Sequence, residues 1–188
     1  MTSGGSSKVE QLSFQIGEGG ALPTSPLQMR VKEMSVFAAC RLNMEWHSRL
    51  PLIDWSNVVR NTYYVCYGAS FDNNWFAVAI WSDPVARNRL NEGKSILELR
   101  RMAICSAAPK NTATWMLGIM IHLIKKRFPA IRKLISYQDT QVHTGTIYKA
   151  AGWLPEQYSR GHKWTTKSRE RNPEQTLANK IRWARELY

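Results

Sequence analysis

A strand, an apolar helix and a second strand follow one another between residues 96 and 137, and this order limits most strongly what the chain can fold into. Residues 96–105 and 131–137 are rich in β-branched and large apolar side chains, which favours strands. Between them, residues 114–128 are apolar over most of a helical surface, and Pro129 stops the helix. This order predicts a βαβ unit with two parallel strands and a buried crossover helix.

The flanking segments extend this unit into a larger sheet. Two runs of β-branched and aromatic residues, 62–67 and 75–81, are separated by turn-forming residues and predict a hairpin. Apolar residues spaced three and four apart over 31–46 predict an amphipathic helix, and 145–151 predict a short one. Strands that first meander and later alternate with helices predict an α/β (α+β) domain, with one mixed central sheet flanked by helices.

Composition divides the chain into three parts. Residues 1–28 are rich in Gly, Ser and Pro and predict a flexible N-terminal arm. Residues 29–165 carry the strand and helix patterns and form the expected catalytic domain. Residues 166–188 predict a basic, helical C-terminal extension, because Asn172-Pro173-Glu174 has the form of a helix start.

The net charge indicates an anionic partner. The 188 residues include 26 Lys and Arg but 14 Asp and Glu, a net charge of +12, which favours nucleic acid, an acidic membrane surface or a polyanionic cofactor. No apolar run reaches the roughly 18–20 residues of a membrane-spanning helix, and the N-terminus does not have the pattern of a secretory signal. Three widely spaced cysteines without a CxxC pair predict buried thiols in a reducing cytoplasm and argue against a zinc site.

The loop 106–112 is a candidate anion site. It joins a strand to the start of a helix, where backbone N–H groups have no partner within the helix, and Lys110 adds positive charge. The alternative is that Asn111 or Thr112 only caps the helix. In the preceding strand, alternation predicts that Arg100 and Arg101 lie on opposite faces, with Arg100 either binding phosphate or pairing with Glu98.

Acid and base groups follow the second strand of the βαβ unit. Asp139 comes directly after this strand, followed by His143 and Tyr148, a combination suited to proton transfer. The alternative is that Asp139 only forms a turn. His47, at the end of the first predicted helix, combines with Asp139 or Tyr148 into a nitrogen and oxygen set that suits iron or manganese, or it is a structural histidine.

Three runs of the sequence resemble a known enzyme core. The runs ELRRMAICSAAPKNTATWMLG, LIKKRFPAIRKLISYQD and HTGTIYKAAGW look like a GNAT-type acyltransferase core. More narrowly, residues 47–163 resemble the Mom family of phage DNA-modifying proteins. The matching positions are Arg101, residues 109–112, the LIKK helix end, Ser136, Asp139, Tyr148, and the segment MEWHSRLP that contains His47.

This resemblance implies conversion of adenine in duplex DNA to N6-(carbamoylmethyl)adenine, which protects phage DNA from host restriction. The catalytic residues that it implies are Asp139, Tyr148, His47 and Ser136. The donor-binding residues that it implies are Arg101, Lys110, Asn111, Thr112 and Thr114. An iron or manganese ion held by His47 and Asp139 is one candidate cofactor.

The loop before the apolar helix departs from the GNAT pattern. GNAT enzymes carry Arg/Gln-x-x-Gly-x-Gly/Ala there, and the glycines let the backbone approach a pyrophosphate closely. This chain has PKNTATWMLG, in which Gly118 is the one glycine. The sequence therefore argues against acetyl-CoA and leaves the donor unknown.

The resemblance implies duplex DNA as the partner, in the cytoplasm of the host bacterium and away from membranes, and the basic residues support this expectation. Residues 100–133 contain eight basic residues and no acidic residue, and residues 158–188 contain eight basic and three acidic residues. The expected DNA contacts are Arg100, Lys163, Lys167, Arg169 and Arg171. The target base has to leave the duplex before it can react, and exposed aromatic side chains can stack on the extruded base.

Three alternatives stay open from the sequence. The chain is a GNAT N-acetyltransferase that uses acetyl-CoA on a small amine or a protein, a DNA-binding protein without catalysis on a GNAT scaffold, or a protein whose basic surface is merely solvated. The sequence is also compatible with a homodimer.

Overall fold

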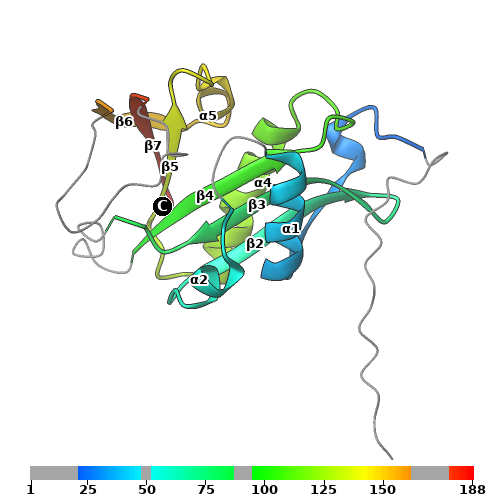
Figure 1. Ribbon diagram of the computed structural model, residues 1–188, viewed down its shortest axis with the longest axis horizontal. Helices are drawn as coiled ribbons and strands as arrows, with labels where there is room; N and C mark the ends of the chain where they lie inside the picture. Colours follow the sequence, from blue (N-terminus) through cyan, green and yellow to red (C-terminus); the bar gives the residue numbers. More distant parts are fainter. Residues whose placement is uncertain (1–20, 48–51, 87–94, 162–177) are drawn as a thin grey trace, which may run out of the picture.

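A seven-stranded mixed sheet forms the centre of the molecule (Figure 1). The computed structural model describes residues 21–47, 52–86, 95–161 and 178–188. The strands are β1 (Arg30–Met34), β2 (Tyr64–Phe71), β3 (Asn74–Ser82), β4 (Ile96–Ile104), β5 (Lys133–Asp139), β6 (Leu154–Ser159) and β7 (Lys180–Glu186). The helices are α1 (Val36–Trp46), α2 (Trp55–Val59), α4 (Thr112–Arg127) and α5 (Thr146–Ala150), with a 3-10 turn, η1 (Pro26–Gln28).

The strand order is β1-β2-β3-β4-β5-β7-β6. The pairs β1–β2, β2–β3 and β3–β4 are antiparallel, whereas β4 and β5 are parallel. Strand β7 runs antiparallel to both β5 and β6. Helix α4 connects β4 to β5, which confirms the predicted βαβ unit. The α+β class with one mixed sheet flanked by helices is also confirmed.

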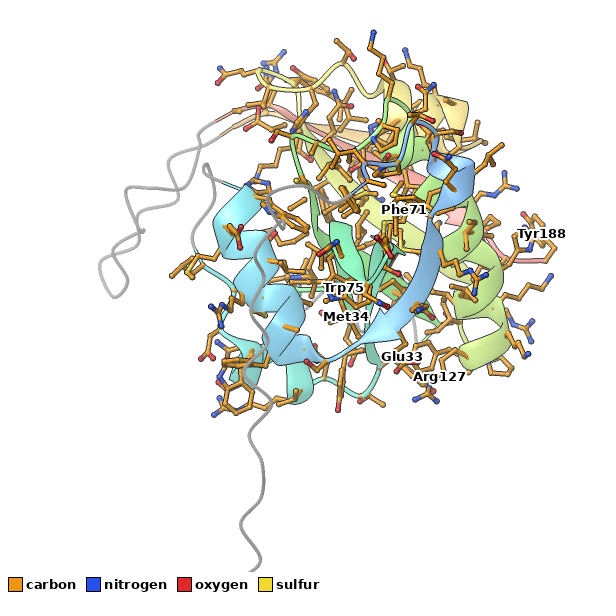
Figure 2. The ribbon with its side chains drawn as sticks, turned by 90° about the vertical axis from the view of Figure 1, so that its right-hand side faces the viewer. Glu33, Met34, Phe71, Trp75, Arg127 and Tyr188 are labelled. Carbon is orange, nitrogen blue, oxygen red and sulfur yellow. The ribbon has the colours of Figure 1, made fainter. Side chains whose placement is uncertain are left out.

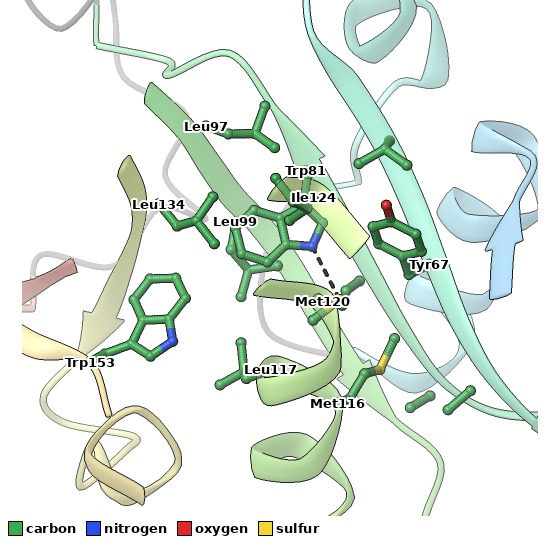
Figure 3. Close-up of a cluster of buried hydrophobic side chains, with 14 of the residues drawn as sticks. Tyr67, Trp81, Leu97, Leu99, Met116, Leu117, Met120, Ile124, Leu134 and Trp153 are labelled. Carbon is green, nitrogen blue, oxygen red and sulfur yellow. Dashed lines mark hydrogen bonds between the residues drawn. The ribbon is translucent and has the colours of Figure 1, made fainter. Parts of the chain in front are cut away.

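Each face of the sheet carries its own hydrophobic core. On the α4 face, Met116, Leu117, Met120 and Ile124 of α4 pack against strand residues and large aromatics that include Trp81 and Trp153 (Figure 3). The Nε1–H of Trp81 points at the sulfur of Met120, 3.2 Å away. On the α1 face, Ala39 and Leu42 of α1 pack against Val78, Ile80 and Ala103.

The predicted hairpin is present, with a tighter turn than residues 68–74 suggested. Strand β2 runs on to Phe71, and β3 begins at Asn74. The connection is Asp72-Asn73, and both residues have positive φ values of 45° and 61°. Asp and Asn tolerate this conformation best after glycine, and it matches the twist of two-residue hairpins.

Two sequence predictions about the ends of the domain are wrong. The expected helix over 31–46 begins only at Val36, because residues 30–34 pair with β2 as an edge strand and Ser35 caps α1. The expected helical extension over 166–188 is strand β7 in its described part, inserted between β5 and β6. Tertiary packing explains this, since alternation buries Trp183 in the α4-face core. The described part of this segment therefore contributes a strand to the central sheet, while the predicted helix start at 172–174 lies outside the described residues.

The predicted arm over 1–28 also ends in regular structure. Residues 1–20 lie outside the described part of the chain, while η1 is closed by a capping box between Ser25 and Gln28. None of the helices in the described ranges is long and apolar enough to cross a membrane. Of the three cysteines, Cys66 and Cys105 are buried, Cys40 is half-buried, and all are free thiols.

Edge strand β1 is held against the rest of the molecule at two places (Figure 2). Glu33 of β1 forms an exposed ion pair with Arg127 in the last turn of α4, at 3.8 Å. On the same strand, Met34 packs with Trp75 over Gly68. A Cβ atom at Gly68 would lie 2.5 Å from the Trp75 ring and 2.9 Å from the Met34 sulfur.

We expect the replacement Gly68→Ala to lower the free energy of unfolding by about 1–3 kcal/mol, because the rigid Trp75 ring has to move. Gly118 of α4 is the matched control, since a Cβ atom there meets nothing within 4 Å. Gly118→Ala should stabilise the protein by about 0.5–1 kcal/mol through the helix preference of alanine. Urea denaturation measures both changes, and equal stabilities for the two variants would contradict the packing described here.

Candidate functional site

The β4–β5 ladder ends part of the way along both strands, and a pocket opens beyond it. The parallel pairing covers four residue pairs and stops at Leu99 and Ser136. The pocket has a volume of about 770 Å³, within the range of small-molecule sites. Its polar lining residues are His47, Arg100, Arg101, Ser136, Tyr137, Asp139, His143, Thr144, Thr146 and Tyr148; Trp46, Leu99, Met102, Ile104, Ala113, Val142 and Ile147 are among the others.

A bulge in β4 places two arginines at this pocket. Ile80 of β3 pairs with Arg101, whereas its neighbour Trp81 pairs with Leu99, so Arg100 is an extra residue in β4. Arg101 lies opposite Ile80, on the α1 face. Arg100 reaches the hydroxyl of Ser82, at 3.0 Å, on the same face. The prediction that the two arginines lie on opposite faces is therefore wrong, because a bulge interrupts the alternation of a strand.

The α4 end of the pocket is built around Tyr148 of α5. Its hydroxyl is 2.9 Å from that of Ser136, and both side chains are buried. The Tyr148 ring stacks on Trp183 at 5.4 Å and meets the edge of Trp153 at 5.8 Å. Burial raises the pKa of the Tyr148 phenol, and the hydrogen bond with Ser136 opposes this shift only in part. Tyr148 is therefore protonated at neutral pH.

Gln138 holds this end of the pocket in place, and the sequence analysis missed it. Its buried side chain accepts a 2.7 Å hydrogen bond from Nε1–H of Trp183 and donates to the carbonyl oxygen of His143. Gly145 lies against the Gln138 amide at a φ of +76°, where a Cβ atom would be 2.6 Å from Gln138 Oε1. The one signal in the sequence was the position of Gln138, two residues after Ser136 on a strand.

His47 lies at the α1 end of the pocket. It follows α1 directly, and its backbone N–H closes the helix on the carbonyl oxygen of Asn43. Burial lowers the pKa of the half-buried His47 imidazole, and the positive charge of Arg101 lowers it further, with a smaller effect from His143. The neutral imidazole is therefore favoured.

Asp139 ends β5 at the same end of the pocket. One carboxylate oxygen accepts the backbone N–H of Gln141 at 2.9 Å, and its carbonyl oxygen accepts the N–H of His143 at 3.0 Å. Asp139 therefore forms a turn, as one of the two alternatives predicted, and also lines the pocket, while its role in proton transfer stays a prediction. No group of three or more His, Cys, Asp or Glu side chains within the described ranges could hold a metal ion. The predicted iron or manganese site at His47 and Asp139 gains no further ligand there.

The structure brings together six of the predicted site residues at this pocket: His47, Arg100, Arg101, Ser136, Asp139 and Tyr148. The predicted donor residues Lys110, Asn111, Thr112 and Thr114 do not line it, and Ala113 alone represents their segment. The predicted DNA contacts Lys163, Lys167, Arg169 and Arg171 lie outside the described residues.

Polar groups of the loop before α4 form hydrogen bonds within the loop itself. Both the backbone N–H and the hydroxyl of Thr112 donate to the carbonyl oxygen of Pro109, at 3.3 and 2.7 Å. Asn111 takes the left-handed conformation, φ 66°, without a side-chain cap. These residues do not fit a pyrophosphate in the way a glycine loop does, because one amide and one hydroxyl at the helix start are turned back onto the loop.

The charge around His47 gives a direct test of the α1 end. We expect the His47 imidazole to titrate below the ordinary 6.5 and Arg101→Gln to move its pKa part of the way back up, since burial remains. Lys110→Gln, which removes a positive charge outside the pocket, should leave the titration unchanged. NMR titration of the histidine ring protons measures this, and an unaltered His47 pKa in Arg101→Gln would refute the assigned contact.

Comparison with solved structures identifies the fold. The ribosomal-protein-S18-alanine N-acetyltransferase of Escherichia coli is 13% identical, with a TM-score of 0.58 over 85% of this chain and 94% of that chain. An N-acetyltransferase of Staphylococcus aureus is 9% identical, with a TM-score of 0.61 over 85% and 97%. An aminoglycoside acetyltransferase in complex with coenzyme A and kanamycin is 13% identical, with a TM-score of 0.56 over 84% and 94%. The chain therefore has the GNAT acetyltransferase fold.

Comparison with sequences identifies the family. No curated protein matches the chain. The Mom protein family matches residues 28–186, which include all the strands and every residue of the pocket. With this match over most of its length, the chain belongs to the Mom protein family.

Proposed function

We propose that this protein modifies phage DNA in the cytoplasm of the host bacterium, converting adenine in the duplex to N6-(carbamoylmethyl)adenine and so protecting the DNA from host restriction. The observation that carries this proposal is a pocket that reaches both faces of the sheet and has different chemistry at each end. The Mom family match supports DNA modification, and the GNAT fold supports a transferase.

The two ends suit two different reactants. Ser136 and Tyr148 line the α4 end, together with the apolar side chains of Leu99 and Met102. His47, Arg101 and Asp139 line the α1 end. Strands β4 and β5 have separated there, so groups that enter from opposite faces can meet between them. We assign the donor to the α4 end and adenine to the α1 end.

We assign different roles to the two candidate residues for proton transfer, Tyr148 and Asp139. The raised pKa of Tyr148 makes it a poor base at neutral pH, so it serves as a hydrogen-bond donor to charge that develops on the donor. Asp139 is the one carboxylate among the described pocket residues, and it suits the role of base. As the adenine N6 forms its bond to the carbon of the donor, the bond between that carbon and its leaving group breaks. The leaving group departs with the electron pair of this bond, and one N6 proton passes to Asp139.

The pocket constrains where the donor binds but does not identify the donor. The solved aminoglycoside acetyltransferase of the same fold holds coenzyme A, but the Pro109–Thr112 loop of this chain does not fit a pyrophosphate in the manner of a glycine loop. We therefore derive no step through coenzyme A. Any donor has to place its reacting carbon between the Ser136–Tyr148 pair and the α1 end of the pocket.

Mass spectrometry of deoxynucleosides from bacteria that express the protein tests the proposal. We expect wild-type protein to produce a deoxyadenosine that carries one carbamoylmethyl group in place of one hydrogen. Tyr148→Phe removes the proton donor, and Asp139→Asn removes the base while it keeps an acceptor for the Gln141 amide. Each should lower the modified fraction at least about tenfold, as losses of a general acid or base do.

Tyr158→Phe is the matched control for Tyr148→Phe, because Tyr158 is exposed on β6 and lies outside the pocket. It should modify adenine like the wild type. Full modification by both pocket variants would rule out the assigned roles, and acetylated products without modified adenine would favour an ordinary acetyltransferase.

Binding to duplex DNA should depend on salt through the basic residues predicted to contact phosphates. Replacing Lys163, Lys167, Arg169 and Arg171 together by Gln should reduce the slope of log K against log salt by about 0.9 for each lost contact. A control that replaces Arg30 and Lys32, on the edge strand β1 at the opposite side of the sheet from β5, should keep the slope. Fluorescence anisotropy at several salt concentrations measures the slopes, and an unchanged slope in the fourfold variant would exclude these residues from the interface.

A further inference from the structure

Three aromatic side chains line the pocket, and they differ in how deeply they are buried. Tyr148 is buried, with Trp183 stacked on its ring and the edge of Trp153 beside it. Trp46 and Tyr137 lie at the α1 end, where the proposed acceptor enters. Trp46 is half-buried and Tyr137 is 36% exposed, so both offer surface to a ligand.

Trp46 is held firmly on the side away from the pocket. It is the last residue of α1, and its ring packs against the α1-face core. The helix itself is anchored by the buried residues Ala39 and Leu42. A large, flat side chain with one side held by the core and another side lining a pocket loses little freedom when a second flat group stacks on it.

Tyr137 comes from the opposite wall. Strand β5 separates from β4 beyond Leu99, and Tyr137 follows Ser136, the last residue of β5 that pairs with β4, so it lies where the pocket opens. Alternation along β5 places Tyr137 and Asp139 on the same face, away from the buried Ser136 and Gln138. The α1 end of the pocket therefore has one aromatic side chain on each wall, with a carboxylate at the end of one of them.

We infer that Trp46 and Tyr137 form a clamp for a single purine base that has been extruded from DNA. Enzymes that act on a base inside a duplex extrude it, stack it between aromatic or apolar side chains and read its hydrogen-bonding edge. Asp139 lies next to the clamp and accepts a hydrogen bond from an exocyclic amino group such as N6 of adenine. This inference rests on the proposed function and specifies how its site holds the target base.

Other planar groups fit this arrangement less well. At this end of the pocket Arg100 pairs with Glu98 at 3.8 Å, while Arg101 adds positive charge, which suits a base that remains attached to a phosphate backbone. Trp46 and Tyr137 both line this end of the pocket and keep part of their surface exposed.

A DNA duplex with one unpaired 2-aminopurine tests the clamp, because this purine analogue is bright when unstacked and is quenched when it stacks on an aromatic ring. We expect wild-type protein to quench it. Trp46→Leu keeps apolar packing against the α1-face core but removes the flat ring. It should lower the affinity measured by quenching roughly five- to hundredfold, the usual range for the loss of one base–aromatic stack.

Two further variants separate stacking from folding. Trp46→Phe restores a ring and should recover most of the quenching. Phe37→Leu is the matched control, since Phe37 is another aromatic residue of α1, is 62% exposed and lies outside the pocket. It should behave like the wild type. Circular dichroism melting confirms that each variant is folded, and anisotropy at the same salt confirms that overall DNA binding persists.

The outcomes distinguish this inference from the proposed function. Quenching by Trp46→Leu as strong as by the wild type would overturn the clamp, even if cells that express the wild type contain modified adenine. Loss of quenching in Trp46→Leu with recovery in Trp46→Phe would support the clamp. If cells then contained no modified adenine, the proposed adenine chemistry would fail while the clamp stood.

Discussion

The site depends on where the parallel pairing between β4 and β5 stops. Up to Leu99 and Ser136 the two strands share backbone hydrogen bonds, and beyond that point they separate. Backbone groups inside a sheet otherwise pair without interruption, since unpaired buried groups cost free energy. The bulge at Arg100 makes the separation compatible with continued pairing between β3 and β4. A pocket through the middle of a sheet is therefore possible without loss of the core on either side.

The two ends of this pocket differ in rigidity as well as in chemistry. At the α4 end, Tyr148 is fixed by Ser136, by stacking on Trp183 and, through Gln138, by the loop that leads into α5. A buried network with satisfied hydrogen bonds holds reacting groups in place before a ligand arrives. The α1 end is lined by half-buried and exposed side chains, which is compatible with the approach of DNA that we propose.

The sequence predicted the central part of the fold because local signals and tertiary packing agree there. The apolar helix, the strands beside it and the residues Ser136, Asp139 and Tyr148 all occur where the pattern placed them. It failed where packing overrides local preference. The start signal at 172–174 suggested a helix, but Trp183 is needed in the core, and the segment around it became β7.

Two features of the site could not be derived from the sequence alone. A bulge is a matter of register between two strands, so the common face of Arg100 and Arg101 could not be derived from alternation. Gln138 works through the distant Trp183 and through the carbonyl oxygen of His143, and its place two residues after Ser136 was the one signal for it. The loop with Lys110 looked like a cofactor site because of its helix start. The structure turns Thr112 of that loop inward, onto Pro109.

The central claim is that target base and donor reach the reaction from opposite faces of one sheet. A crystal structure of the protein bound to duplex DNA that contains a modifiable adenine tests this claim most directly. We expect one adenine turned out of the duplex into the α1 end of the pocket, with its N6 amino group next to Asp139. An adenine that remains stacked in the duplex, or that enters beside α4, would contradict it.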